Sequence, residues 1–481
     1  MQKFLYIILA CLCYLQQANA SYNLPDMGSQ ASVTLSPAAE RAIGEFYMEQ
    51  IRAYGMIYYD PLIDDYLQQL TYPLRTANNT QQNFTFFMVR DPSINAFAMP
   101  GGFIGINTGL ITAARSESEV ASVMAHEMAH VTQRHIARSF ERQQRSLLPT
   151  LAAILGSAIL ATQSPEAGMG ALTATMAGSQ QAAINFTREN EEEADRVGMD
   201  LLYNSGYDPN AMSDFFTRLW EAHRYNQYNL PEFLSTHPMS EARIADSKNR
   251  ATQYATKTHQ DSMEFYLVKA RVDYTNTQST RRLIADYKAK LNSSQGSANS
   301  RQNQVLRYGY ALGLAQTADY KQALVEVKQL RQIDSSNIFY RIAEADILSK
   351  SKQKSAALNV LQDTYKLYPD SQAATLNYAD ALIDSENYSK ARDVLRRYTR
   401  AHPNHTVALS MLAEAQGKSG HMVEAYQTRA DILVSYGDYR GAIKQLEYAL
   451  KESKGDQYLT SSLNARIKEL KAKELKREEE S

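Results

Sequence analysis

Alanines that recur every 34 residues are the feature that most limits the fold of this 481-residue chain. One series comprises Ala311, Ala345, Ala379 and Ala413, and a second comprises Ala323, Ala357, Ala391 and Ala425. Each unit contains one alanine of each series, twelve residues apart, which predicts a small residue on each of two packed antiparallel helices. Since such a hairpin cannot bury its apolar face alone, we expect consecutive units to stack into a solenoid with a concave surface.

This pattern resembles tetratricopeptide repeats over about residues 305–450, with a further helix at 439–451 as a cap. The resemblance implies a repeat domain with a C-terminal helix over residues 305–481. Residues 258–304 are predicted to be a degenerate helical pair followed by a linker.

The first twenty residues are typical of a secretory signal peptide. Lys3 precedes an apolar run over residues 4–15, and Ala18-Asn19-Ala20 matches the small-x-small cleavage pattern. The run is shorter than the roughly 20 apolar residues that span a bilayer. We therefore expect cleavage after Ala20 and export. A retained N-terminal anchor and a lipoprotein modified at Cys11 are the alternatives.

Cleavage would remove both cysteines, Cys11 and Cys13, and with them any disulfide, thiolate nucleophile or cysteine-based zinc site. A metal would then have to be held by histidines and carboxylates. An exported chain of this size without disulfides fits a bacterial periplasm. The net charge of −1 argues against nucleic acid as a partner, and the 44% hydrophobic and 21% charged residues are those of an ordinary globular protein.

The segment before the repeats mixes strands and helices. Alternating apolar residues predict strands at 83–90 and 96–106, the second broken by Pro100-Gly101-Gly102. A capping-box sequence, Ser116-Glu-Ser-Glu119, opens a helix predicted to run to about residue 145, and a charged helix is expected from about 188 to 204. The apolar stretch 147–161 is too short to span a membrane. It is predicted to be a buried helix or a lid, with peripheral membrane or apolar-substrate contact as the alternative.

The sequence His126-Glu127-Met128-Ala129-His130 is an HExxH motif within the predicted helix. Residues i and i+4 share one helical face, so both imidazoles can reach one zinc ion, and Glu127 can reach a water on that ion. The alternative is a helix with two exposed histidines. A catalytic zinc site also needs a third protein ligand. Glu191 and Asp195, four residues apart, could supply it, with one binding metal while the other accepts the free N–H of a ligand histidine.

The HExxH motif, the preceding segment 95–105 and the Glu191-x-x-x-Asp195 pair resemble the zinc metallopeptidases of family M48. The resemblance implies a mainly α (α+β) fold, with a zincin-like, gluzincin-type domain over residues 21–257 that contains a small β-sheet. It implies His126, His130 and Glu191 as ligands of one Zn²⁺ per chain. It also implies Glu127 as general base, Asp195 as an accessory acid, and the 95–105 segment as the strand against which an extended peptide pairs.

His237, in Ser235-Thr-His-Pro238, and Arg243 resemble the His-Pro…Arg segment of the same family. The resemblance places them near the cleft. There His237 would stabilise an oxyanion or occupy the fourth zinc position as a latch, and Arg243 would support the site or contact substrate. A loop histidine without such a resemblance is more often a surface residue. His135, five residues after His130, is expected to point away from the metal face.

A signal peptide, an M48-type site and tetratricopeptide repeats together resemble the exported family members that act in outer-membrane protein assembly. The resemblance implies a periplasmic zinc metalloendopeptidase that degrades misassembled outer-membrane β-barrel proteins and assists their assembly. Its repeats would bind substrate or the β-barrel assembly machinery. The alternative function is a chaperone or assembly scaffold whose latent protease site is secondary. The spacing of the motif residues by itself predicts only zinc binding and peptide hydrolysis.

Overall fold

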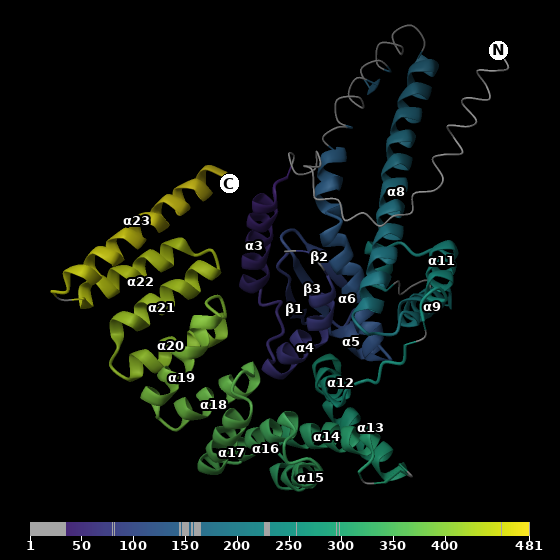
Figure 1. The fold of residues 1–481 in the computed structure, drawn as a ribbon. Helices are drawn as coiled ribbons and strands as arrows, with labels where there is room; N and C mark the ends of the chain where they lie inside the picture. The colour runs from purple at the N-terminus through teal and green to yellow at the C-terminus, as the bar shows by residue number, and fades with distance from the viewer. Residues whose placement is uncertain are drawn as a thin grey trace.

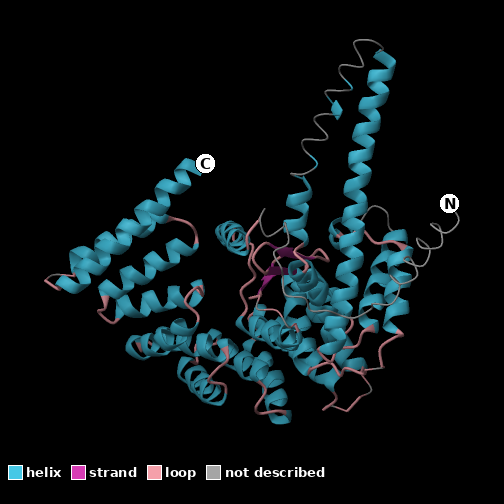
Figure 2. Ribbon diagram, turned by 45° about the horizontal axis from the view of Figure 1, so that its top comes forward, coloured by secondary structure: helices cyan, strands magenta, loops and turns pink. Residues whose placement is uncertain are grey.

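The computed structural model describes residues 35–480, except residues 79, 81, 144–145, 147–152, 155–156, 158–164, 226–230, 256, 295, 298 and 454. The predicted signal peptide and most of the apolar stretch 147–161 therefore lie outside the described residues. The described part is mostly helical with one small sheet, which confirms the predicted fold class (Figure 1, Figure 2).

Three short strands form the sheet: β1 (Thr85–Val89), β2 (Ala96–Met99) and β3 (Phe103–Asn107). Their order is β1-β3-β2, with β1 parallel and β2 antiparallel to β3. Gly101 and Gly102 in the turn between β2 and β3 have φ values of 79° and 84°, which glycine adopts without steric cost. The break predicted at these glycines is therefore a tight turn, and it leaves β2 at the edge of the sheet.

Helix α6 (Glu117–Thr132) is the centre of the segment before the repeats, and it packs against β2, α8 and α9. The serine half of the predicted capping box forms, because the Ser116 hydroxyl accepts the Glu119 N–H at 3.2 Å. The Glu119 carboxylate reaches one residue further back and accepts the Arg115 N–H at 2.6 Å. Val120, Val123, Met124 and Met128 are fully buried. The other helices of this part are α3 (Pro37–Ala53), α4 (Pro61–Ala77), α5 (Thr108–Ala113), α8 (Pro165–Asn204), α9 (Asn210–Tyr225), α10 (Glu232–Thr236) and α11 (Glu241–Ala251).

Two predicted helix boundaries are wrong. The helix expected from Ser116 to about residue 145 is interrupted after α6, and a second helical segment follows at 135–143. Arg134 marks the break with a left-handed φ of 55°, and its guanidinium donates to the Glu40 carboxylate at 2.9 Å. Helix α8 begins at Pro165 rather than near 188 and extends away from the rest of the structure (Figure 1). The high helix propensity of alanine and methionine in its first turns outweighs the glycines there.

The repeats form a solenoid of consecutive helices. They are α12 (Met263–Asn276), α13 (Thr280–Ser293), α14 (Arg301–Gln316), α15 (Tyr320–Ile333), α16 (Ile338–Lys350), α17 (Lys354–Leu367), α18 (Gln372–Asp384), α19 (Tyr388–Ala401), α20 (Thr406–Lys418), α21 (Met422–Ser435), α22 (Tyr439–Glu452) and α23 (Gln457–Glu480). From α13 onward each helix packs on the next, and all eight periodic alanines are at most 3% exposed. The 34-residue spacing therefore does mark the small residues at which paired helices meet.

The solenoid curves around one side of the sheet and its helices (Figure 1). Helix α4 packs against α18, and Asp65 of α4 lies at the N-terminus of α18. The Asp65 carboxylate accepts the Gln372 and Ala373 N–H groups at 3.1 and 3.0 Å and the Ser371 hydroxyl at 2.5 Å. A carboxylate at this end of a helix is favoured by the unpaired N–H groups and by the helix dipole. One charged side chain thus joins the two parts of the chain.

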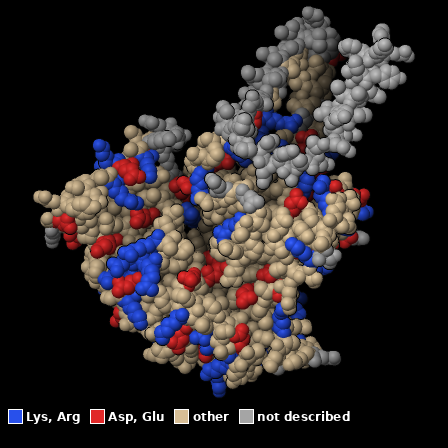
Figure 3. Space-filling view, in the orientation of Figure 1, with Lys and Arg blue, Asp and Glu red and all other residues tan. Residues whose placement is uncertain are grey.

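The surface carries both signs of charge. Acidic and basic side chains both occur over the face shown in Figure 3, and the chain as a whole has a net charge of −1. Among the described residues, no helix combines the length and the apolar character that crossing a membrane requires.

We expect Asp65→Ala to loosen the first turn of α18. The substitution removes the acceptor of two backbone N–H groups, and a capping interaction of this kind contributes about 1–2 kcal/mol. Since about 1.4 kcal/mol is tenfold in an equilibrium constant, amide hydrogen exchange at Gln372 and Ala373 should be about tenfold faster. Asp363→Ala, at an exposed aspartate of α17, is the control. Equal exchange rates in the two variants would contradict the role assigned to Asp65.

Candidate active site

The HExxH residues lie in the interior of the molecule rather than on its surface. His126 is fully buried and Glu127 is 1% exposed, so the alternative of two exposed histidines is wrong. The i, i+4 spacing on α6 brings the Nε2 atoms of His126 and His130 to 3.0 Å of each other. Both rings therefore present a nitrogen to one point.

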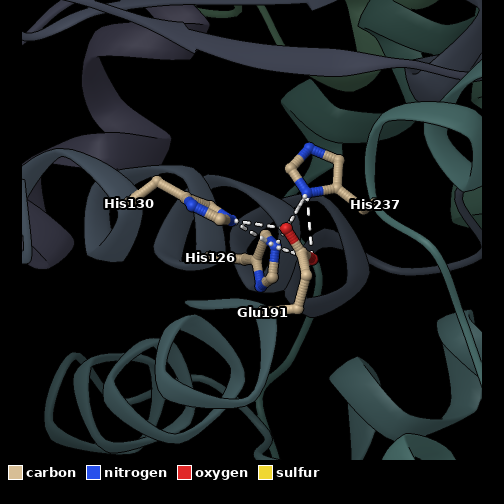
Figure 4. A group of neighbouring side chains, drawn as sticks. All are labelled: His126, His130, Glu191 and His237. Atoms are coloured by element: carbon tan, nitrogen blue, oxygen red, sulfur yellow. Dashed lines mark hydrogen bonds and ion pairs between the residues drawn. The ribbon is translucent and has the colours of Figure 1, made fainter. Parts of the chain in front are cut away.

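Two further side chains reach the same point from elsewhere in the chain. Glu191 of α8 lies with its carboxylate oxygens 3.4 Å from the Nε2 atoms of His126 and His130. His237, the residue at the C-terminal end of α10, places its Nδ1 3.1 Å from the Glu191 carboxylate and 3.3 Å from His126 Nε2. Figure 4 shows the three rings and the carboxylate facing one another. His237 is 7% exposed and is not the surface residue that its loop position alone would favour.

The spacing of these donor atoms fits a zinc ion. Ligands of tetrahedral zinc at about 2.0–2.1 Å from the metal stand about 3.3 Å from one another. The contacts given above join donor atoms 3.0 to 3.4 Å apart. One donor atom from each of the four residues, His126, His130, Glu191 and His237, lies within 4.8 Å of the other three. Three imidazoles and a carboxylate are also a donor set that zinc prefers.

Helix α8 comes close enough to supply Glu191 because it carries a glycine at its crossing with α6. A Cβ atom added to Gly198 would lie 3.1 Å from the Cα and from the N of His126. Contacts of that length with a neighbouring backbone are too tight for an ordinary side chain. A larger residue at this position would push α8, and Glu191 with it, away from the HExxH helix.

Asp195, one helical turn after Glu191, fixes the orientation of His126. Its Oδ1 lies 3.0 Å from His126 Nδ1, and a carboxylate at this nitrogen favours the tautomer with the proton on Nδ1 and the Nε2 lone pair directed at the cluster. Arg243 of α11 holds Asp195 with two hydrogen bonds of 2.8 Å and lies 3.1 Å from the Glu191 carboxylate. Arg243 therefore supports the cluster from behind and does not face the cleft.

Positive charge is needed wherever two carboxylates are buried together. Burial disfavours the charged form of His126, but hydrogen bonds and charges from Asp195 and Glu191 outweigh it and raise its pKa to about 10. Burial opposes ionisation of Glu191, yet His126 and His237 beside it hold the pKa of this carboxyl well below its usual range. The two carboxylates thus favour positive charge in this cluster, which is the environment that suits a divalent cation.

Glu127 has the position and the environment of a general base. Its side chain is buried next to the cluster, with Oε1 3.2 Å from His237 Nε2. Burial raises the pKa of Glu127, which makes its carboxylate a stronger base than a solvated glutamate. A cleft of 310 Å³ opens here, and its lining includes Glu127, His130 and His237 together with Phe97 and Ala98 of the edge strand β2.

His135 lies off the metal-binding face, as predicted, but its contact with His130 was not foreseen. Its Nδ1 lies 2.8 Å from Nδ1 of His130, on the side of that ring away from the cluster. The predicted helix continued without interruption, whereas the left-handed Arg134 turns the chain and brings His135 against the far side of the His130 ring. Sequence reasoning also missed Glu193, which lies 3.2 Å from His135 Nε2. A third histidine five residues after the HExxH motif was the only sequence signal for this contact.

We expect Arg243→Leu to destabilise the zinc-free protein by about 3–5 kcal/mol, because it leaves the Glu191 and Asp195 carboxylates buried without their cation. Arg250→Leu on the same helix is the control. Its exposed pair with Asp246 should contribute no more than about 1 kcal/mol. Denaturant unfolding measures both variants against the wild type. If both lost the same stability, Arg243 would not neutralise buried charge.

Comparison with known families matches residues 62–251 to "Peptidase family M48" and residues 348–415 to "Tetratricopeptide repeat". The "Beta-barrel assembly-enhancing protease" of Escherichia coli (strain K12) is 36% identical over 455 residues, which are 94% of this chain and 92% of that protein. The "Putative beta-barrel assembly-enhancing protease" of Vibrio cholerae is 37% identical over 441 residues, 92% of this chain and 90% of that protein.

A more distant similarity covers about a third of the chain. The "Mitochondrial metalloendopeptidase OMA1" of Arabidopsis thaliana is 33% identical over 156 residues, 32% of this chain and 29% of that protein. The matches from Escherichia coli and Vibrio cholerae, by contrast, run through both the HExxH site and the repeats. The chain therefore belongs to the beta-barrel assembly-enhancing proteases, metallopeptidases of family M48 that carry tetratricopeptide repeats.

Proposed function

We propose that the chain is a zinc endopeptidase with one Zn²⁺ held by His126, His130 and Glu191. The observation that carries this proposal is the convergence of their donor atoms at zinc-like separations beside the buried Glu127. When bound, zinc lowers the pKa of water and polarises a peptide carbonyl. Glu127 takes the proton of the attacking water and returns it to the leaving amine. Asp195 acts through His126, whose tautomer it fixes.

His237 is proposed to be a latch in the fourth ligand position. Its Nδ1 faces the same point as the three ligands, and its Nε2 faces Glu127 at 3.2 Å. In that position the ring excludes substrate from the metal and engages the general base. A protease that lives among unfolded chains needs such a restraint. The competing role is that His237, once displaced by substrate, stabilises the oxyanion.

Substrate is proposed to bind as an extended strand along β2. This strand is at the edge of the sheet, and its Phe97 and Ala98 line the cleft beside Glu127. Edge strands bind peptides by continuing the ladder of backbone hydrogen bonds, which is independent of side-chain identity. Such a mode suits a peptidase that acts on many unfolded chains.

We further propose that residues 1–20 direct export to the periplasm and are cleaved after Ala20. The peptidase domain would then comprise residues 21–257. The degenerate helical pair and linker would comprise 258–304, and the repeat domain 305–481. The names of the relatives point to outer-membrane β-barrel proteins as the clients. The peptidase would degrade misassembled clients and assist their assembly. The repeats would bind those clients or the β-barrel assembly machinery, since stacked helical repeats offer extended protein-binding surfaces.

A second candidate function is an assembly chaperone whose protease site is secondary. The position of His237 inside the ligand cluster favours it, because there the ring takes up the fourth ligand position that a catalytic site leaves open. The two functions differ in their dependence on Glu127. A scaffold continues to promote β-barrel assembly without the general base, whereas a function based on proteolysis alone is lost.

We expect Glu127→Gln to retain one zinc per chain and to lower casein cleavage by about 10²–10⁴-fold, the usual contribution of a general base. Glutamine keeps the volume but cannot accept the proton. Glu192→Gln, which makes the same chemical change at an exposed position of α8, should leave both zinc content and cleavage unchanged. Metal analysis and a casein assay on the same samples measure the zinc content and the cleavage rate of each variant. Full activity in Glu127→Gln would refute the assigned base, and a wild-type protein without zinc would refute the metal site.

We expect His237→Ala to increase casein cleavage while the zinc content stays at one per chain. The latch predicts an increase of about tenfold if the ring favours the closed state by about 1.4 kcal/mol. A decrease in cleavage at unchanged zinc content would contradict the latch and support the oxyanion role. Combining His237→Ala with Glu127→Gln is the control, because the added cleavage must disappear with the base.

A further inference from the structure

His130 is held from behind by a chain of polar side chains that none of the roles proposed above uses. His135 Nδ1 lies 2.8 Å from His130 Nδ1, and the two ring centroids are 4.8 Å apart. On its other side His135 Nε2 lies 3.2 Å from the Glu193 carboxylate. Arg138 donates to the same carboxylate oxygen at 2.7 Å. The order of contacts is therefore His130, His135, Glu193 and Arg138.

A local break in the helix places His135 in this row of polar side chains. Gln133 and Arg134 end α6, and the left-handed Arg134 redirects the chain into the helical segment at 135–143. The break is fixed from outside, because the Arg134 guanidinium donates to the Glu40 carboxylate at 2.9 Å and to the Leu35 carbonyl. His135 is 4% exposed as a result. A polar ring so deeply buried requires hydrogen-bond partners, and His130 and Glu193 are those partners.

The positions of the ring protons give this row of hydrogen-bonded side chains a single donor-to-acceptor direction. His130 presents Nε2 to the ligand cluster, so its proton is on Nδ1, where it donates to His135 Nδ1. A ring that accepts at Nδ1 carries its own proton on Nε2, and that proton is donated to Glu193. The negative charge of Glu193, held by Arg138, thus selects the tautomers of two successive rings.

We propose that His135, oriented by Glu193, is a positioning residue that fixes the tautomer and ring angle of His130 for zinc binding. The proposal rests on zinc binding at the site. It gives the two histidines of the HExxH motif separate supports: Asp195 lies directly beside His126 Nδ1, and Glu193 supports His130 through the ring of His135. Outer partners of this kind orient metal-ligating histidines and make their lone pairs more available to the metal.

Zinc affinity, measured by competition with a chromophoric chelator on the purified chain, tests the proposal without reference to catalysis. His135→Phe keeps the ring volume but removes the acceptor, and it should weaken zinc binding by about 10–100-fold. His135→Asn retains an acceptor oxygen near the position of Nδ1 and should recover part of that loss. Glu193→Gln, which removes the charge, should also weaken binding. Glu192→Gln, the neighbouring exposed change, should bind zinc as the wild type does.

The outcomes separate this proposal from that of the zinc site. A wild-type chain that binds no zinc refutes the site itself. A wild-type chain that binds zinc, with His135→Phe of equal affinity or with His135→Asn no better than His135→Phe, overturns the positioning role alone. Melting curves of the zinc-free variants show whether each has folded. If His135→Phe does not fold, Glu193→Gln decides: weaker binding supports the role, and unchanged binding overturns it.

Discussion

The burial of two carboxylates four residues apart on α8 is the constraint around which the peptidase part is built. Glu191 and Asp195 are each at most 3% exposed, and such charges are stable in the interior only when cations and donors surround them. The partners come from three other segments: the HExxH residues from α6, His237 from the end of α10 and Arg243 from α11. The need to surround these two carboxylates with cations and hydrogen-bond donors therefore determines how the helices are arranged. The same arrangement brings the metal-binding atoms together.

The sequence was most informative where structure depends on regular spacing. The 34-residue alanine period and the i, i+4 histidines each follow from helix geometry, and the repeat helices and the His126–His130 pair form as expected. Where long-range packing decides, spacing was insufficient. His237 meets His126 across 111 residues, and only resemblance to a family placed it near the cleft. The contact of His135 with His130 was missed because a single left-handed residue, Arg134, cannot be read from helix periodicity. The start of α8 was misplaced because glycines were weighted above alanines.

The solenoid and the peptidase part share an extensive contact. Besides Asp65 at the start of α18, Asp60 forms an ion pair with Arg271 of α12, and the Tyr59 hydroxyl lies 3.3 Å from the hydroxyl of Thr406 in α20. Arg52 donates to the carbonyl of Ser435 at 3.2 Å. Contacts therefore extend from the first solenoid helix to α21. A protein bound to the inner side of the repeats has the peptidase part as its immediate neighbour.

The contact between Asp65 and Gln372 joins residues 307 positions apart, and this separation has a consequence for the order of folding. Closing a chain loop of that size costs about 5 kcal/mol of entropy before the contact offsets it. Each repeat, in contrast, folds on contacts with its nearest neighbours. We therefore expect the repeats and the peptidase core to form before they dock. Before docking, α4 and α18 would both expose surfaces that the native chain buries, and transiently exposed surface of this kind favours aggregation.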